Sequence, residues 1–160
     1  MSRRLTLLRH GEATPVDKDG PGFDFARTLT RRGEREAWES ATLIASLPQP
    51  PVCVLAREAP RARQTATIAI DALGLPSRAL TVEPQLYLAD VRMLLDVIAT
   101  VDDTCLHVLV VAHNPGLSEL VHVLAPGSAF GSLATGAWCT LESPAGSWAL
   151  LEVDRARLDR

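Results

Sequence analysis

The chain has 160 residues, a formal net charge of −3 and an apolar fraction of 47%, as expected for a globular protein with a hydrophobic core. No basic excess indicates a nucleic-acid partner, and no apolar run is long enough to span a membrane. The only N-terminal apolar run, Leu5–Leu8, is too short for a signal-peptide core. We therefore expect a single domain over residues 1–160, located in the cytoplasm, with neither a nucleic-acid nor a membrane partner.

Strand-like and helix-like segments alternate along the chain. Apolar runs predict four strands, over 5–8, 52–56, 80–83 and 106–112. Capping and first-turn residues predict four helices, beginning at Thr30, Pro60, Asp90 and Asn114. Two late strands are expected over 137–141 and 148–153, and the charged end over 154–160 is expected to fray. This alternation predicts an α/β fold of three layers, α/β/α, with a mostly parallel central sheet.

The cysteines and tryptophans are expected to be structural. An odd number of cysteines in apolar runs favours reduced core residues over a disulfide framework, and these are Cys53, Cys105 and Cys139. Packing in the core or at a sheet edge is expected for Trp38, Trp138 and Trp148.

Two of the predicted strands end in a histidine beside a turn. Arg9-His10-Gly11 follows the first strand, and His113-Asn114-Pro115-Gly116 follows the strand over 106–112. The carboxyl ends of parallel strands meet at one edge of a sheet, where open α/β sheets bind their ligands. We therefore expect His10 and His113 to lie close together in a binding site.

Arginines surround this predicted site. Arg9 precedes His10, while Arg27 and Arg61 follow loops that reach the same edge, each at or near the start of a helix. Guanidinium groups match the geometry of tetrahedral oxyanions, and helix N-termini add backbone donors. A phosphoryl group is therefore the predicted ligand.

Four blocks in a fixed order carry a resemblance to a known family. They are Arg9-His10-Gly11-Glu12, Leu29-Thr30-x-x-Gly33 preceded by Arg27, Arg61-Ala62-x-Gln64-Thr65, and Ala112-His113-Asn114-Pro115-Gly116. Together they resemble the histidine phosphatase superfamily, the phosphoglycerate-mutase-like group, over essentially the whole chain. Leu86-Tyr87-Leu88 and Thr135-Gly136-Ala137 are similar to segments of its SixA-like branch of phosphohistidine phosphatases.

The resemblance implies the phosphoglycerate-mutase-like fold and a phosphatase that needs no metal or other cofactor. It implies that His10 is the nucleophile and forms a transient phosphohistidine. The catalytic residues that it implies are His10, Arg9, Arg61 and His113. The substrate-binding residues that it implies are Arg9, Arg27, Arg61, His113, Gly11 and Asn114. The expected partner is a protein carrying phosphohistidine or a small phosphorylated metabolite.

The sequence departs from the family pattern at Arg57-Glu58, where the family usually has Ser-Pro. This exchange, four residues before Arg61, replaces a pocket hydroxyl with charged side chains. It affects the expected substrate preference and leaves the core of the predicted site intact.

The general acid has no clear position in the sequence. Larger family members take a glutamate from an inserted segment, and this chain is short between Arg61 and His113. Glu83 and Asp90 are the candidates by position, whereas Glu12 is expected to orient its neighbours. A missing acid matters less for phosphohistidine, because its P–N bond is weak and the imidazole leaves after protonation by solvent. A phosphohistidine or phosphoprotein substrate is therefore favoured.

Two alternative functions are kept: a small-molecule phosphomonoesterase or mutase of the same superfamily, and a non-catalytic phosphate-binding module in signalling. Other classes fit poorly. No cysteine has an arginine six residues further on, as a cysteine phosphatase requires, and the histidines lack metal-ligand spacing. The remaining histidines, His107 and His122, are expected to be structural.

Overall fold

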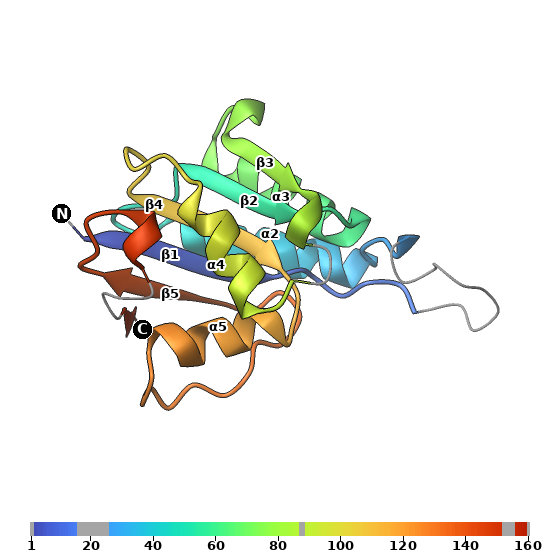
Figure 1. The fold of residues 1–160 in the computed structure, drawn as a ribbon. Helices are drawn as coiled ribbons and strands as arrows, with labels where there is room; N and C mark the ends of the chain where they lie inside the picture. Colours follow the sequence, from blue (N-terminus) through green and yellow to red (C-terminus); the bar gives the residue numbers. More distant parts are fainter. Residues whose placement is uncertain (1, 16–25, 87–88, 152–155, 160) are drawn as a thin grey trace.

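The computed structural model describes residues 2–15, 26–86, 89–151 and 156–159, and a six-stranded sheet lies at its centre (Figure 1). Its strands are β1 (Arg3–Arg9), β2 (Cys53–Arg57), β3 (Leu80–Glu83), β4 (His107–Ala112), β5 (Trp138–Ser143) and β6 (Arg157–Asp159). The spatial order is β3-β2-β4-β1-β5-β6. The first four strands in this order run parallel, and β5 and β6 are antiparallel to their neighbours. The predicted mostly parallel sheet is confirmed.

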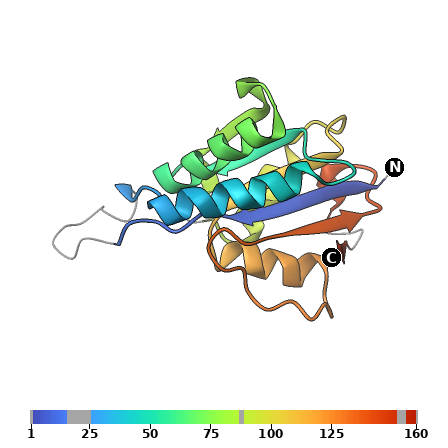
Figure 2. The ribbon, with the colours of Figure 1, turned by 180° about the vertical axis from the view of Figure 1, so that it is seen from behind.

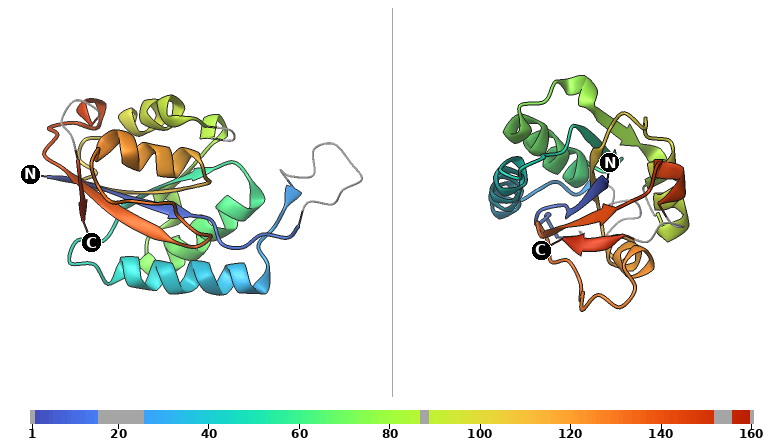
Figure 3. Two further views of the ribbon diagram at one scale, coloured as in Figure 1. Left: turned by 90° about the horizontal axis from the view of Figure 1, so that it is seen from below. Right: turned by 90° about the vertical axis from the view of Figure 1, so that its left-hand side faces the viewer.

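Four helices in the described residues form the outer layers: α2 (Arg31–Ala45), α3 (Pro60–Leu73), α4 (Val91–Ala99) and α5 (Gly116–Leu124). Figure 2 shows α2 and α3 in front of one face of the sheet, and the left panel of Figure 3 shows the three layers edge-on. Strand residues alternate between the two faces. Leu7 packs in the core shared with α4 and α5, and Leu8 packs in the core shared with α2 and α3.

Local sequence sets the helix ends where the capping residues predict them. The Thr30 hydroxyl accepts a hydrogen bond from Gly33 N at 3.0 Å and caps α2. Pro60 is the first residue of α3, and Gly74 ends that helix in the left-handed conformation with φ 64°. Asp90 Oδ1 accepts from Met93 N at 3.0 Å and caps α4. The three predicted helix starts are confirmed.

The strand β4 is central, as its apolar sequence predicts. All six of its residues are buried, and β2 and β1 pair with it on either side. His107, the first residue of β4, is buried and its ring bonds to the Thr6 hydroxyl and to the Gln49 carbonyl. No helix in the described part of the chain is long and apolar enough to cross a membrane.

The C-terminal region differs from the prediction in two places. Trp148–Leu150 forms a short 3-10 helix, η3, where the strand over 148–153 is expected, because the Trp148 indole is buried and donates to the Cys105 carbonyl at 2.8 Å. Residues 157–159, expected to fray, form β6 and pair with β5. Residues 152–155 and 160 lie outside the described residues.

The helix α5 begins at Gly116 with Pro115 as its N-cap, one residue later than a cap at Asn114 predicts. Asn114 does not act as its N-terminal cap in the expected way. Its side-chain oxygen accepts hydrogen bonds from Ser118 N at 3.3 Å and from Ser118 Oγ at 2.7 Å, while its amide nitrogen donates to the Leu133 carbonyl at 2.7 Å. The side chain therefore ties the helix to the segment before β5.

The prediction that all three cysteines are reduced is wrong, because Cys53 and Cys105 form a disulfide. Cys53 begins β2, and Cys105 stands just before the neighbouring strand β4, so their Cα atoms are 6.5 Å apart, within the range that a disulfide spans. Cys139 is a free thiol, and burial raises its pKa to about 12.

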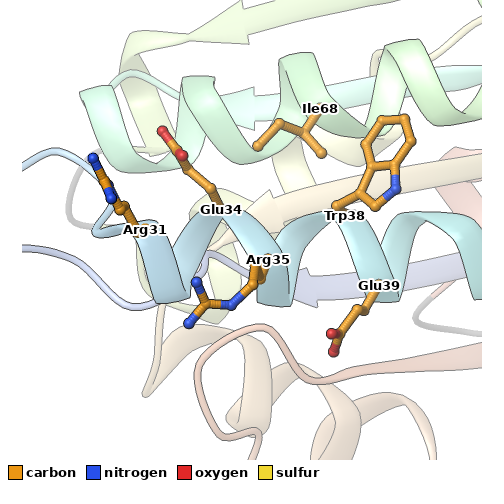
Figure 4. A pocket seen from close by; sticks show the side chains of 6 residues that line it. All are labelled: Arg31, Glu34, Arg35, Trp38, Glu39 and Ile68. Carbon is orange, nitrogen blue, oxygen red and sulfur yellow. The ribbon is translucent and has the colours of Figure 1, made fainter.

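The prediction that Trp38 packs in the core or at a sheet edge is also wrong, since its side chain is 52% exposed. The inward face of α2 consists of Ala37, Ala41 and Ile44, all of them buried. Trp38 stands one residue away from this stripe, on the outer side of the helix (Figure 4).

Candidate active site

His10 lies directly after β1, at the carboxyl edge of the sheet, and is 6% exposed. Its Nδ1 is 2.8 Å from the carbonyl oxygen of Gly11. A carbonyl oxygen only accepts hydrogen bonds, so Nδ1 must carry the proton, and in the neutral ring Nε2 holds the lone pair. Arg61 Nε donates to this Nε2 at 3.3 Å. The arrangement fixes the tautomer and directs the lone pair of Nε2 toward Arg61.

Burial, with a smaller effect of the nearby charges of Arg61, Arg9 and Arg57, lowers the pKa of His10 to about 4, against the opposing effect of the hydrogen bond to Gly11. The imidazole is therefore neutral at pH 7, and its lone pair is available. Protonation sets in only as the pH falls toward 4, so acidification from pH 7 to 5 leaves the imidazole neutral.

An NMR titration of the free protein checks this electrostatic picture. We expect the ring signals of His10, assigned by their loss in His10→Asn, to titrate with a midpoint near the pKa of about 4. A midpoint near 6.5, the usual value for histidine, would show that the ring is solvated and that the surrounding arginines do not act on it.

Arg61 reaches the site from the first turn of α3 and is 3% exposed. Its position is fixed through Thr65, whose hydroxyl donates to the Arg61 carbonyl at 2.8 Å and accepts from Gly11 N at 3.2 Å. The neighbouring Gln64 accepts from Leu29 N at 2.8 Å. Three of the four sequence blocks are thus hydrogen-bonded to one another around His10. The neighbouring Arg63, by contrast, is exposed.

Arg9 is half-buried at the end of β1, and its guanidinium Nη1 donates to the Leu133 carbonyl at 2.9 Å. Burial lowers its pKa, while the nearby charge of Glu36 raises it. The backbone of this region is held by Gly136, whose N–H donates to the carbonyls of Arg9 at 3.1 Å and His10 at 3.0 Å. The Thr135-Gly136-Ala137 segment therefore holds the backbone of Arg9 and His10 in place.

His113 lies beside His10 because β1 and β4 are neighbours. Arg9 pairs with Ala112 in the register, and His10 N donates to the Ala112 carbonyl at 3.2 Å. His113 follows at the same edge and is half-buried. Asn114 stands next to it, although its side chain serves the structural contacts with Ser118 and Leu133 described above.

Arg27 stands two residues before Leu29, which forms an antiparallel bridge with Ala13. Its Nε donates to the Thr14 carbonyl at 2.5 Å, and the side chain is half-buried. This places Arg27 with the loop that follows His10, which is consistent with the predicted position at the rim.

The two acid candidates, Glu83 and Asp90, lie at the end of β3 and at the start of α4. Asp90 caps α4, so one of its oxygens is engaged by Met93 N. Glu83 ends β3 and pairs with Arg57 in the register. Glu12 binds Thr30 Oγ at 2.9 Å through its carboxylate, in agreement with an orienting role.

Arg57 is the residue near the site that local sequence reasoning placed wrongly. It lies one residue beyond the predicted strand over 52–56, yet it is the last residue of β2, and its side chain is 0% exposed. Its charge lies close enough to lower the pKa of His10. The departure from the family's usual Ser-Pro was the only signal in the sequence.

A separate hollow lies on the outer face of α2 and α3, with a volume of about 610 Å³ (Figure 4). Its lining residues are Arg31, Glu34, Arg35, Trp38, Glu39 and Ile68. It contains none of the predicted site residues. Within the described ranges, no three histidine, cysteine or carboxylate side chains are grouped to hold a metal ion.

No protein-family model and no curated protein matches the sequence, but solved structures match it closely. A protein from Nakamurella multipartitia, whose assignment as the phosphohistidine phosphatase SixA is provisional, has a TM-score of 0.85 and 26% identity over 100% of this chain and 95% of its own. The protein histidine phosphatase SixA complexed with tungstate has a TM-score of 0.79 and 26% identity over 98% of this chain and 94% of its own. The mycobacterial glucosyl-3-phosphoglycerate phosphatase has the same fold, with a TM-score of 0.70 and 19% identity over 99% of this chain and 98% of its own.

The chain has the phosphoglycerate-mutase-like fold, and its similarity to SixA-type phosphatases of the histidine phosphatase superfamily supports a phosphatase enzyme. Within that superfamily, the SixA structures match it with higher TM-scores than the glucosyl-3-phosphoglycerate phosphatase does. The resemblance predicted from the four blocks is confirmed. The roles of the individual site residues stay predictions.

Proposed function

We propose that residues 1–160 form one histidine phosphatase domain that hydrolyses phosphohistidine on proteins without a metal, in two steps through a phosphorylated His10. The observation that carries this proposal is the state of the His10 ring. Its Nδ1 is held by the Gly11 carbonyl, and its Nε2 is directed to Arg61. A neutral, oriented imidazole in a cationic pocket is what attack on phosphorus requires.

In the first step, His10 Nε2 attacks the phosphorus atom, a new P–N bond forms, and the bond to the substrate's imidazole breaks. The leaving imidazole takes up a proton. Charge on the three equatorial oxygens is stabilised by Arg9, Arg61 and His113, of which Arg61 is already beside Nε2 at 3.3 Å. Arg27 adds a contact at the rim.

In the second step, water attacks the phosphorus atom of phospho-His10. The P–N bond breaks, inorganic phosphate leaves, and the electron pair returns to Nε2. The Gly11 carbonyl keeps the proton on Nδ1 throughout, so the ring regains the same tautomer after each turnover. No group outside the chain and water is needed to balance the reaction.

The carboxylates support the choice of substrate. Asp90 is engaged as a helix cap, and Glu83 stands beside Arg57 in the register. An alkyl phosphate needs a strong general acid because its alkoxide leaves poorly, whereas imidazole leaves after protonation by solvent. A site in which Asp90 already serves as a helix cap is better suited to phosphohistidine.

Phosphate release from two substrates tests the proposal: a phosphohistidine protein and p-nitrophenyl phosphate, both with a metal chelator present. We expect release from phosphohistidine with kcat/KM at least about a hundredfold above that for the aryl ester, because the weaker P–N bond needs no strong acid. The variants Glu83→Gln and Asp90→Asn should leave phosphohistidine turnover within about threefold.

A preference for p-nitrophenyl phosphate over phosphohistidine would support a second candidate function. Two neighbours are a glucosyl-3-phosphoglycerate phosphatase and an α-ribazole-5′-P phosphatase, which favours a small-molecule phosphomonoesterase as the alternative. Faster turnover of the ester, lost in Glu83→Gln or Asp90→Asn, would select that alternative and identify the acid. Phosphate binding without any turnover would instead indicate a non-catalytic signalling module.

A further inference from the structure

Arg57 occupies a place that the proposed chemistry does not yet use. It is the last residue of β2, wholly buried, and stands four residues before Arg61. Burying a guanidinium costs free energy unless the surroundings compensate its charge. Arg57 lies at the carboxyl edge of the sheet, and this position indicates the role of its charge.

The strand register places Arg57 beside the phosphoryl site. Ala56 pairs with Val111 on β4, and Val111 in turn pairs with Leu8 on β1. One residue further on, Arg57 and Arg9 therefore stand on either side of Ala112 in one row across the sheet. Their Cα atoms are two strand spacings apart, about 10 Å.

The two arginines also share a face of the sheet. Leu55 and Leu7, each two residues earlier on its strand, both pack in the core under α4 and α5. Ala112, between them, carries only a methyl group, and the next residue on its strand is His113. The row across the sheet therefore contains Arg57, Ala112 and Arg9, and His113 comes directly after Ala112. Glu83 pairs with Arg57 and ends the row on β3.

Its burial determines how Arg57 acts. At 0% exposure it does not present a surface to the substrate, unlike the hydroxyl expected at this position in the family. Solvent nevertheless screens a buried charge only weakly, so the charge of Arg57 can interact with a ligand several ångströms away. Burial is the main cause of the lowered pKa of His10, and the charge of Arg57 adds to it after those of Arg61 and Arg9.

We propose that Arg57 is an electrostatic positioning residue of the phosphoryl site, which strengthens the binding of a tetrahedral dianion by its charge from behind Ala112 and His113. This inference rests on the proposed function, because it concerns the same site. Its consequence is a preference that grows with the charge of the ligand. The pocket favours a dianionic phosphoryl group over a singly charged oxyanion of the same shape.

Direct binding of two tetrahedral oxyanions, tungstate with two charges and perrhenate with one, tests the inference by calorimetry near neutral pH. Arg57→Met removes the charge and keeps the side chain's bulk. We expect this variant to bind tungstate at least about tenfold more weakly. Its affinity for perrhenate should fall by about the square root of that factor, since the Coulomb energy scales with ligand charge. Arg57→Lys keeps the charge and should stay within about threefold of the unmodified protein for both ions.

Arg78→Met is the matched control, because it removes one exposed arginine from the 3-10 helix before β3, at the opposite end of the sheet. It should change neither affinity. Thermal unfolding shows which variants are folded. The His10 midpoint should rise in Arg57→Met and stay low in Arg57→Lys, which a purely structural role would not produce.

Three results overturn the inference: unchanged tungstate affinity in Arg57→Met, equal losses for both ions, or loss of tungstate binding in Arg57→Lys. Should Arg57→Met fail to fold, Arg57→Lys and Arg57→Ser decide by the same criteria. Binding is measured without turnover. An inactive protein that shows this charge-dependent binding therefore contradicts the proposed function while supporting the role of Arg57.

Discussion

His10→Ala is expected to lower phosphohistidine turnover at least about a thousandfold while the protein stays folded. The variant removes the only atom positioned for attack, Nε2, whose lone pair is kept available by the hydrogen bond from Nδ1 to Gly11. The charged groups beside it are the guanidinium ions of Arg61, Arg9 and Arg57, which have no lone pair to offer, and we propose that His113 binds the phosphoryl oxygens instead of attacking phosphorus. The loss should therefore appear in kcat for every substrate.

Two further measurements separate chemistry from folding. His10→Asn retains an N–H that can bind the Gly11 carbonyl, so it should unfold near the temperature of the unmodified protein and still lack turnover. His122→Asn changes an exposed histidine on α5 and should keep full activity. Rapid quenching of the unmodified protein should trap phosphate on His10 in an acid-labile form. Substantial turnover in His10→Ala would remove it as the nucleophile.

The elements with strong local signals were predictable from the sequence. The apolar run before Ala112 gives the central strand, and the capping residues Thr30 and Asp90 start their helices as expected. The same rules place His10 and His113 at one sheet edge, since both follow parallel, neighbouring strands. Periodicity and capping are local properties, which is why one sequence suffices to find them.

Features that depend on contacts distant in sequence were not predictable. Cys53 and Cys105 are 52 residues apart and meet only because β2 pairs with β4. Trp148 lies in a strand-like run, yet its indole bonds to the Cys105 carbonyl in a 3-10 helix. Arg57 looks like a loop residue until the register of β2 is known. Tertiary contacts decide these positions, and the local pattern does not contain them.

Gly33 illustrates this limit most directly. Near the start of a helix, a glycine is expected only to lower stability, by about 1 kcal/mol relative to alanine. In the structure, a Cβ on Gly33 would lie 2.0 Å from the Glu12 carbonyl oxygen, and a Cβ on Gly11 would lie 2.2 Å from the Gly33 carbonyl oxygen. The two backbones touch, and this contact fixes the loop after His10 against α2.

Gly33→Ala is therefore expected to destabilise the protein by about 2–3 kcal/mol, despite the better helix propensity of alanine. The atoms that the new methyl group meets belong to the backbone of Glu12, which cannot rotate away as a side chain can. Moving this backbone also shifts Gly11, whose carbonyl orients the His10 ring. Turnover of the folded variant should fall about a hundredfold, because a displacement of about 1 Å misaligns the nucleophile.

Urea unfolding and phosphohistidine turnover measure the two effects on the same samples. Gly131→Ala is the matched control: a Cβ there meets nothing within 4 Å, so we expect stability within about 0.5 kcal/mol of the unmodified protein and full turnover. If Gly33→Ala is instead more stable than the unmodified protein, helix propensity dominates, and the close contact between α2 and the loop after His10 does not hold the site together. Lower stability with normal turnover would mean that the loop moves without carrying His10 with it.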